Sequence, residues 1–274
     1  PYRKTPEFDI YPYVKDNFAL PTKSDPAELF IERALKLSRL EGRSSLIVPK
    51  PLTYTISWKE TRSLLKNYRI ERLADCYEAF DDVLLEQVVY VIANAPAKKS
   101  KVIPARRVDS KFEEGTPISV RYFSEDFLPM HITPQTTILY DHVWAMSVRL
   151  DSVANLWEGP GYNQYLSDDP TGLPCFKGDH VARYEILNIA YLPQKMTPPD
   201  TEMYREEKGI LQRIVAHVTK PFPRIIIMAS IDDTGSLTVN TLTDFVGKQV
   251  STAFLVAIMN SRFTSWYAYD FIFN

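Results

Sequence analysis

The side chains that most often carry out chemistry are few in this 274-residue chain, and they are widely spaced. Cys76 and Cys175 are the only cysteines and lie about a hundred positions apart, which fits neither a disulfide framework nor a zinc cluster. The histidines show no metal-ligand spacing, and a lone histidine is more often structural than catalytic. We find no serine-nucleophile motif, phosphate loop or P-D…E-x-K nuclease signature. The four histidines are His131, His142, His180 and His217.

Positive charge is concentrated in one short stretch, where only Asp109 opposes it. Such a run attracts the phosphates of a nucleic acid, and it is just as typical of a solvated linker between domains. The whole chain has a net charge of −2 and a pI near 6.2, so charge alone does not identify a partner. The stretch contains Lys98, Lys99, Lys101, Arg106, Arg107 and Lys111.

Residues 24–95 alternate between helical and strand patterns. Asp25 can accept hydrogen bonds from the free amides of a helix start, Pro26 suits the first turn, and Glu28 can complete a capping box. An apolar stripe follows at helical spacing, and Gly42 is typical of a helix end. Residues 45–48 then predict a short buried strand. The stripe contains Ala27, Phe30, Ile31, Ala34, Leu35 and Ser38.

A second capping box at residues 57–60 predicts a helix that runs to about residue 66. Strands follow at residues 69–76 and 87–93, joined by an acidic loop. Helix, strand, helix, strand, strand is the order found in the closing half of a three-layer α/β sheet. Three strands alone would leave an exposed edge and an uncovered face, so we expect the opening half of the sheet to be missing from this chain. The start at Pro1, without an initiator Met, fits a fragment.

The remaining sequence has a different texture. Residues 98–126, which include the basic stretch, are a candidate junction, and residues 127–274 are expected to form a mixed α+β domain. β-like runs lie at residues 137–140, 144–148, 224–229 and 237–240, and a helix is expected at residues 251–263. No apolar run approaches the roughly 20 residues of a membrane-spanning helix. The low cysteine content fits a reducing cytosol.

Four stretches follow the order and spacing of one protein family. Pro1-Tyr2 looks like the tail of an Asn-Pro-Pro-Tyr motif, and residues 30–49 carry F-I-E-R-A-L, G-R and I-V-P in the family's order. Residues 61–80 are similar to the run before the family's last hairpin. Residues 176–184, 223–235 and 254–263 look like three parts of its recognition domain. Together they resemble the gamma-class N6-adenine DNA methyltransferases of restriction–modification systems, most closely the single-chain type IIG enzymes.

The resemblance implies a fold and an active-site fragment. Residues 1–97 would be the C-terminal half of a Rossmann-like methyltransferase sheet, residues 98–126 a basic junction, and residues 127–274 an α+β target-recognition domain. In the family, Asn and Pro accept hydrogen bonds from the adenine amino group while aromatic rings stack on the flipped base. Here the Asn and the first Pro would precede residue 1, so of Pro1 and Tyr2, which match the end of the motif, only Tyr2 could take its family role. Tyr2 and Phe80 would then lie on opposite faces of the adenine.

The resemblance also implies partners. Double-stranded DNA would be read in its major groove, with Arg and Lys side chains on phosphates and guanine edges. The methyl donor would be S-adenosylmethionine, the location the prokaryotic cytoplasm, and no membrane is expected. The expected DNA contacts are Lys177, Arg183 and Arg224, with Lys98, Lys99, Arg106 and Arg107 adding phosphate attraction.

The chain also departs from the family. The glycine-rich loop for S-adenosylmethionine is expected upstream of Pro1, so we expect this fragment alone to be inactive. The missing N-terminal part of the same polypeptide, or a separate subunit, would bind the cofactor. Two other readings stay open: a non-catalytic specificity module that works with a methylating subunit, and an unrelated α/β enzyme with catalytic histidines. The α/β half argues against a pure specificity module.

Overall fold

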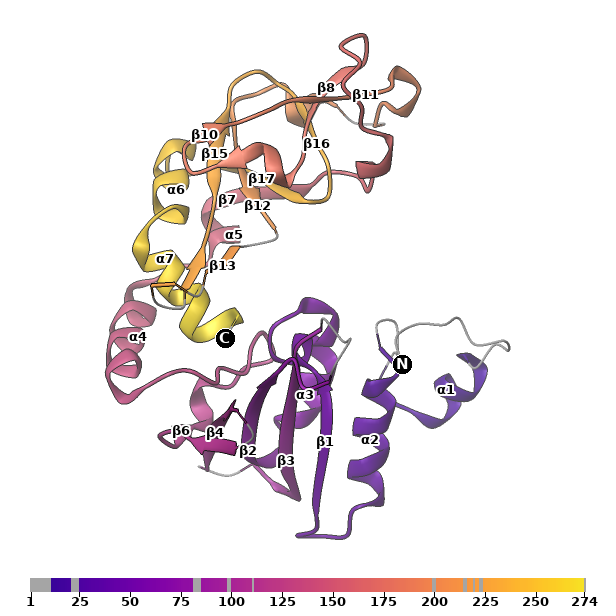
Figure 1. Cartoon of the computed structure of the whole chain (residues 1–274), viewed down its shortest axis with the longest axis vertical. Coiled ribbons are helices and arrows are strands. Elements are labelled where there is room, and N and C mark those ends of the chain that lie inside the picture. Colours follow the sequence, from indigo (N-terminus) through magenta and orange to yellow (C-terminus); the bar gives the residue numbers. More distant parts are fainter. Residues whose placement is uncertain are drawn as a thin grey trace. The chain divides into compact units, whose positions relative to one another are not determined.

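The computed structural model describes residues 11–20, 25–80, 85–97, 100–109, 111–198, 201–213, 216–218, 220–221 and 224–273. The chain divides into two compact units (Figure 1). Unit 1 comprises Pro1–Leu139 with Asp270–Asn274, and unit 2 comprises Tyr140–Tyr269. Among the described helices, none combines the length and apolar character that a membrane crossing requires.

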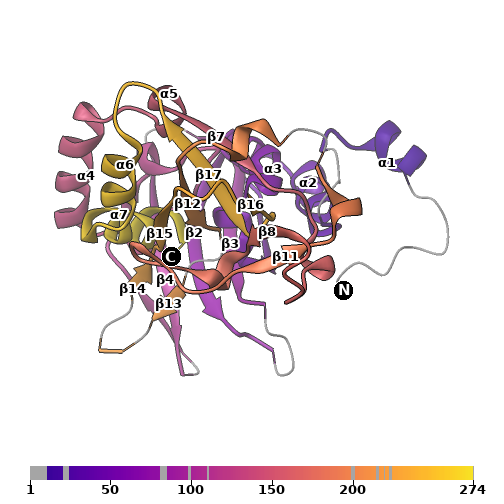
Figure 2. The same ribbon diagram turned by 90° about the horizontal axis from the view of Figure 1, so that it is seen from above.

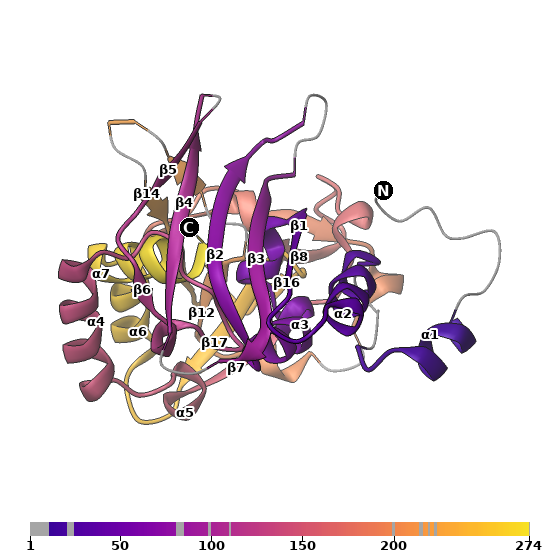
Figure 3. The same ribbon diagram turned by 90° about the horizontal axis from the view of Figure 1, so that it is seen from below.

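Unit 1 is built on a six-stranded sheet with the order β1-β3-β2-β4-β5, and β6 pairs with β4. Its strands are β1 (Arg43–Pro49), β2 (Tyr68–Tyr77), β3 (Gln87–Pro96), β4 (Lys101–Val108), β5 (Lys111–Glu114) and β6 (Ile118–Ser119). Strand β3 is antiparallel to both β1 and β2, so β1 and β2 run in the same direction. Figure 3 shows β4, β2, β3 and β1 side by side. The strands predicted at residues 45–48, 69–76 and 87–93 are therefore confirmed.

The first helices are α1 (Tyr11–Asn17), α2 (Ala27–Leu37) and α3 (Lys59–Leu65), with 3-10 turns at Lys50–Thr53, Ile56–Trp58 and Val120–Tyr122. Helix α2 contacts β1 of the sheet, and α3 contacts β2. The capping box before α2 is confirmed, because Ala27 N donates to Asp25 Oδ1 at 2.8 Å and Asp25 N donates to Glu28 Oε1 at 3.3 Å. At α3 the 3-10 turn precedes the helix, and Trp58 takes the N-cap position in place of Ser57.

The buried face of α2 differs from the predicted stripe. Phe30 is 67% exposed, whereas Glu28 and Glu32 are buried together with Ile31 and Leu35. Both glutamates are satisfied: Thr61 Oγ1 donates to Glu28 at 2.7 Å, and the backbone amides of residues 19 and 20 donate to Glu32. The prediction counted only apolar residues, so it placed Phe30 on the buried face of α2. That face instead carries Glu28 and Glu32, whose carboxylates are hydrogen-bonded.

The basic stretch is part of this sheet. Strand β4 pairs in parallel with β2, with Asp75 opposite Arg106, and it buries Val102 while its arginines face outward. Arg62 of α3, which is buried, donates to the carbonyl of Glu125 at 2.7 Å and so holds the following segment as well. Residues 98–126 therefore lie within unit 1 and not between two units. The boundary falls between Leu139 and Tyr140.

Unit 2 contains several small sheets. The largest has the order β15-β12-β17-β7, and helix α6 packs against it (Figure 2). A second sheet, β11-β8-β16, and the two-stranded pairs β10-β9 and β13-β14 complete the β structure. The strands are β7 (Ala154–Glu158), β8 (Leu173–Phe176), β9 (Val181–Ala182), β10 (Glu185–Ile186), β11 (Ala190–Leu192), β12 (Lys208–Gln212), β13 (Ala216–Val218), β14 (Arg224–Ile226), β15 (Ala229–Asp232), β16 (Leu237–Thr238) and β17 (Leu242–Gly247).

The helices of the second half show one wrong prediction. Residues 134–146 form helix α4 (Pro134–Met146), although residues 137–140 and 144–148 were predicted as β-like. Thr133 and Thr136 cap this helix reciprocally, since Thr133 N donates to Thr136 Oγ1 at 2.7 Å and Thr136 N donates to Thr133 Oγ1 at 3.2 Å. Local capping outweighed the β propensity of the run. The other elements are α5 (Leu150–Val153), α6 (Thr252–Met259), α7 (Arg262–Tyr267) and a π-helical turn, Ala268–Phe273.

The C-terminal helix prediction is largely confirmed. Ser251 caps α6 by accepting from Phe254 N at 3.2 Å, and Leu255 and Val256 are buried against Phe245 of β17. The helix stops at Asn260, and α7 starts after it. The chain is thus of the mixed α/β class, with an α/β sheet unit followed by an α+β unit, as expected.

The core of unit 2 contains a buried charge network. Lys208 is fully buried and pairs with Asp232, and it donates to the carbonyls of Tyr204 at 3.2 Å and Ser236 at 2.9 Å. Asp244 is also fully buried and accepts a hydrogen bond from Thr238, and no donor among the described residues reaches its Oδ1. The pKa of Asp244 is raised to about 7, chiefly by burial and also by the charge of Asp232, while the hydrogen bond from Thr238 and the charge of Lys208 act to lower it.

This carboxyl predicts a pH-dependent stability. The pKa of Asp244 in the folded protein, about 7, lies above its ordinary value of 3.8, so the folded state binds this proton more tightly and stability falls as pH rises from about 4 to 7. We expect Asp244→Asn to remove that loss and to raise the free energy of unfolding at pH 8 by on the order of a few kcal/mol. Thermal melts of both proteins between pH 5 and pH 8 measure this.

Asp232→Asn is the matched control, because it removes the partner of Lys208 and should destabilise the protein across the same range. Parallel pH profiles of wild type and Asp244→Asn would contradict the prediction.

Candidate nucleic-acid interface

The turn that carries Phe80 lies at the end of β2. Phe80 is 52% exposed. Tyr77, which ends β2, has a positive φ of 50°, and its amide donates to Asp75 Oδ1 at 3.0 Å. Ala79 N donates to Gln87 Oε1, at the start of β3, at 2.8 Å. The turn is therefore held from both strands while the Phe80 ring faces solvent, a geometry suited to stacking on a flat ligand.

A buried ion cluster supports this turn. Lys50, just after β1, donates to Asp75 at 2.7 Å and to Glu86 at 2.6 Å, and its side chain is only 4% exposed. Burial lowers the pKa of Lys50, but attraction and hydrogen bonds from Asp75 and Glu86 outweigh it and give a net rise. For Asp75, burial alone would raise the pKa. Hydrogen bonds from His131 and Lys50, together with the positive charge of Lys50, outweigh burial, so the net pKa of Asp75 is lowered. Both groups are therefore charged, and they join the ends of β1, β2 and β3.

The sheet brings two of the predicted basic residues to this turn. Because Arg106 lies opposite Asp75 in the parallel β2–β4 pair, it lies at the same end of the sheet as Phe80. The pKa of the Tyr77 hydroxyl is raised, mainly by burial, and the positive charge of Arg106 partly opposes this rise. Arg106 pairs with Glu113 at 3.2 Å, and Arg107 donates to the carbonyl of Asp109 at 3.0 Å. Both arginines can exchange these solvent-exposed partners for phosphates.

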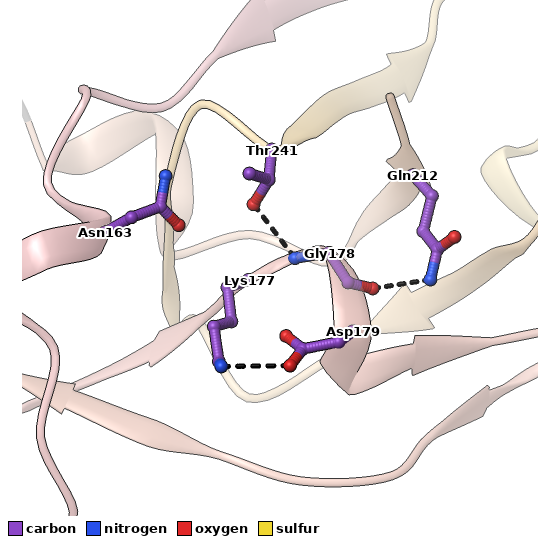
Figure 4. Close-up of a pocket in the computed structure, with 6 residues that line it drawn as sticks. All are labelled: Asn163, Lys177, Gly178, Asp179, Gln212 and Thr241. Atoms are coloured by element: carbon purple, nitrogen blue, oxygen red, sulfur yellow. Dashed lines mark hydrogen bonds and ion pairs between the residues drawn. The ribbon is translucent and has the colours of Figure 1, made fainter. Parts of the chain in front are cut away.

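Unit 2 has an open polar pocket of about 370 Å³ (Figure 4). Lys177 and Asp179 form an ion pair at 2.9 Å on one side, and this hydrogen bond lowers the pKa of Asp179. Gln212 anchors the turn between them by donating to the carbonyls of Gly178 at 2.5 Å and Val181 at 2.7 Å. The pocket is lined by Asn163, Lys177, Gly178, Asp179, Gln212 and Thr241, a mixture of donors and acceptors.

Arg183 lies on the short β9–β10 hairpin and donates to the backbone carbonyl of Asn260. The Asn260 side chain, which is fully buried, accepts from Ala229 N at 3.0 Å and donates to Ala229 O at 2.8 Å. One asparagine therefore ties the end of α6 to β15 and to the hairpin. Arg183 therefore donates a hydrogen bond that stabilises the fold, and the residue is exposed.

The other predicted residues are placed as follows. Arg224 begins β14 and donates to the carbonyl of Lys220 at 2.8 Å. Pro1, Tyr2, Lys98 and Lys99 lie outside the described residues. Phe80, Arg106 and Arg107 thus share one edge of unit 1, while Lys177, Arg183 and Arg224 belong to unit 2. The DNA-binding role of each stays a prediction.

Two of the histidines belong to different units. His131 Nε2 lies 3.5 Å from Asp75 in unit 1, whereas His180 in unit 2 is buried, and this burial lowers its pKa. In the described parts of the chain no group of three or more His, Cys, Asp or Glu side chains could hold a metal ion.

The residues present do not fit S-adenosylmethionine. A glycine loop for such a cofactor leads from a strand into a helix. Gly42 precedes β1 and Gly115 follows β5, and neither leads into a helix. The sequence has one Gly-x-Gly, Gly159-Pro160-Gly161, but it lies in unit 2 after β7, where a Cβ on Gly159 would be 2.1 Å from the Thr238 carbonyl. Close packing explains that glycine.

Several important residues escaped the sequence analysis. Lys50 and Asp75 are far apart in sequence, and nothing local indicates that they pair. Asn260 lies in a stretch whose apolar residues predict a helix, but nothing in that pattern indicates its side-chain hydrogen bonds. No local pattern distinguishes Gln212. The basic stretch was noted, but its register beside β2 depends on a parallel pairing that no local pattern reveals.

Comparisons with known proteins place the fold. No protein-family model matches the chain, and no curated protein matches it in sequence. Among solved structures, the type IIL restriction–modification enzyme MmeI in complex with DNA is similar over 92% of this chain, with a TM-score of 0.54 and 10% identity. The type IIG restriction endonuclease BpuSI is similar over 85%, with a TM-score of 0.34 and 13% identity. This chain spans 39% and 38% of those chains. Its fold is therefore similar to part of a restriction–modification enzyme chain.

The Asn260 clamp generates a stability prediction. Asn260→Ala leaves the buried amide of Ala229 without its acceptor and removes one of the two donors to the Ala229 carbonyl, so we expect a loss of about 2–4 kcal/mol in the free energy of unfolding. Asn188→Ala, at an exposed asparagine, should change it by less than about 0.5 kcal/mol. Chemical denaturation of the three proteins measures both values. Equal effects of the two substitutions would rule out the clamp.

Proposed function

We propose that this chain is part of a site-specific adenine-N6 DNA methyltransferase of a restriction–modification system. Its part would be to recognise double-stranded DNA and to supply one side of the pocket for an extruded adenine. The observation that carries this proposal is the similarity in fold, over 92% of the chain, to an enzyme whose structure is described in complex with DNA. The motif resemblance of unit 1 agrees with it, as does the position of the exposed Phe80 at the same end of the sheet as Arg106.

In this proposal the two units have separate tasks. The Phe80 ring packs on the adenine, and Tyr2 closes the other face. Removing a base from the stack costs a few kcal/mol, which stacking on aromatic rings offsets. Arg106 and Arg107 bind phosphates beside the pocket, and unit 2 reads the duplex with Lys177, Arg183 and Arg224. S-adenosylmethionine, which supplies the methyl group when bound, would be held by another part of the parent polypeptide or by a separate subunit.

A second candidate is a DNA-specificity module without catalysis of its own. The same DNA-binding residues would serve it. The turn at Phe80 agrees with the first candidate, because an exposed ring on a backbone held by Asp75, Gln87 and the Lys50 cluster can stack on an extruded base. The two differ in whether Phe80 affects methylation beyond its effect on binding.

The first test is binding of the full 274-residue chain to a mixed-sequence DNA duplex. If it makes about four phosphate contacts, affinity should fall about a hundredfold between 50 and 200 mM salt, because counterions are released on binding. Fluorescence anisotropy at several salt concentrations measures this. No binding at 50 mM salt would contradict both candidates.

The second test uses the parent enzyme. Phe80→Ala should lower methyl transfer by roughly 10- to 100-fold, the effect of losing one base-stacking ring, and should leave DNA affinity within about threefold. Phe254→Ala, which removes a similarly exposed ring from unit 2, is the control for folding. Methyl transfer from labelled S-adenosylmethionine and duplex affinity are measured for both. Equal losses of methylation and of binding in Phe80→Ala would contradict a pocket role.

A further inference from the structure

The hairpin of β9 and β10 carries an unusual tyrosine. Ala182 pairs with Glu185, so Arg183 and Tyr184 form a two-residue turn. Tyr184 has a φ of 65°, in the left-handed region that glycine favours, and its side chain is 59% exposed. A bulky residue in this region is a backbone outlier, and such outliers concentrate at functional sites.

The neighbouring structure fixes the backbone of this turn. Tyr184 N donates to the carbonyl of Ala229 at 2.9 Å, and the Asn260 side chain donates to the same carbonyl at 2.8 Å. Arg183 donates to the carbonyl of Asn260. Several hydrogen bonds therefore hold the backbone of this turn, and none of them depends on the side chain at position 184. Glycine or asparagine would adopt it with less strain.

The other described non-glycine residues with positive φ have structural explanations. Tyr77 places its ring over Lys50, whose ammonium group lies 5.4 Å from the ring centroid, and it bonds Asp75. Glu41 forms an ion pair with Arg69, and Asp109 is a polar residue in a tight turn, a type that tolerates this region. Tyr184 differs from them, because its exposed ring lies outside the apolar core clusters of unit 2.

We propose that Tyr184 is a DNA-contact residue whose ring enters a groove of the duplex and packs against bases or sugars there. The inference rests on the proposed function and names a residue that makes the contact. A tyrosine on a fixed backbone has only two side-chain torsions to order, so it contacts a ligand at low entropic cost. Apolar and aromatic side chains that enter a groove are a known way to hold DNA. Arg183, next to it, supplies a cation for the flanking phosphates.

The test compares full-length chains with substitutions at this one position. Tyr184→Gly removes the ring and relieves the left-handed strain, while the entropy cost of glycine opposes that relief, so the melting temperature should change little. Affinity for a mixed-sequence 30-base-pair duplex should fall about tenfold. The slope of log affinity against log salt should not change, because no charge is lost. Tyr184→Phe should bind as wild type does.

Two further variants complete the design. Tyr184→Asn keeps a residue that tolerates positive φ, and it decides the question by the same criteria if the glycine variant fails to fold. Tyr13→Ala removes an equally exposed tyrosine, 58% against 59%, from unit 1 and should leave affinity unchanged. A tenfold loss with the glycine and asparagine variants, at unchanged melting temperature and salt slope, supports the proposal.

The remaining outcomes separate two failures. If wild type binds the duplex and the glycine and asparagine variants bind equally well, Tyr184 makes no DNA contact, and the proposed function stands. A loss in Tyr184→Phe as large as in Tyr184→Gly overturns groove packing in favour of the hydroxyl group. If wild type itself does not bind the duplex at 50 mM salt, the proposed function and this inference both fail.

Discussion

A charged lysine ammonium group is costly to bury unless a carboxylate lies beside it, and each unit of this protein contains such a pair. In unit 1, Lys50 joins Asp75 and Glu86 at the ends of three strands. In unit 2, Lys208 joins Asp232 in the core of the largest sheet. Each pair connects strands that are distant in sequence, so breaking it would leave an uncompensated charge and would also separate the strands. The polar ends of both sheets are fixed in this way.

This constraint has a functional consequence in unit 1. The Lys50 cluster and the side chains of Asp75 and Gln87 fix the backbone before Phe80, whose ring stays exposed. The parallel pairing of β4 with β2 then adds Arg106 to the same edge. A rigid aromatic surface beside a cation suits a base and its phosphate. The arrangement agrees with the proposed role in base extrusion.

Unit 2 uses a different device. It has small sheets and short hairpins, and side-chain amides hold their backbones together: Asn260 binds both backbone groups of Ala229, and Gln212 binds the turn that follows Lys177. These amides leave the surface residues of the turns free to vary without loss of the fold. Recognition domains benefit from such a division, because contact residues on loops can change while the scaffold persists.

The sequence by itself determined the elements whose signals are local. The Asp25–Glu28 capping box, strands β1 to β3 and the capped helix after Ser251 all follow from residues a few positions apart. Tertiary structure decided the features that depend on distant partners: the two buried glutamates on α2 in place of Phe30, the entry of the basic stretch into the sheet as β4, and the left-handed turn at Tyr184. The physical reason is that burial of a charge, parallel strand pairing and backbone strain are stabilised by groups elsewhere in the chain, which no local pattern contains.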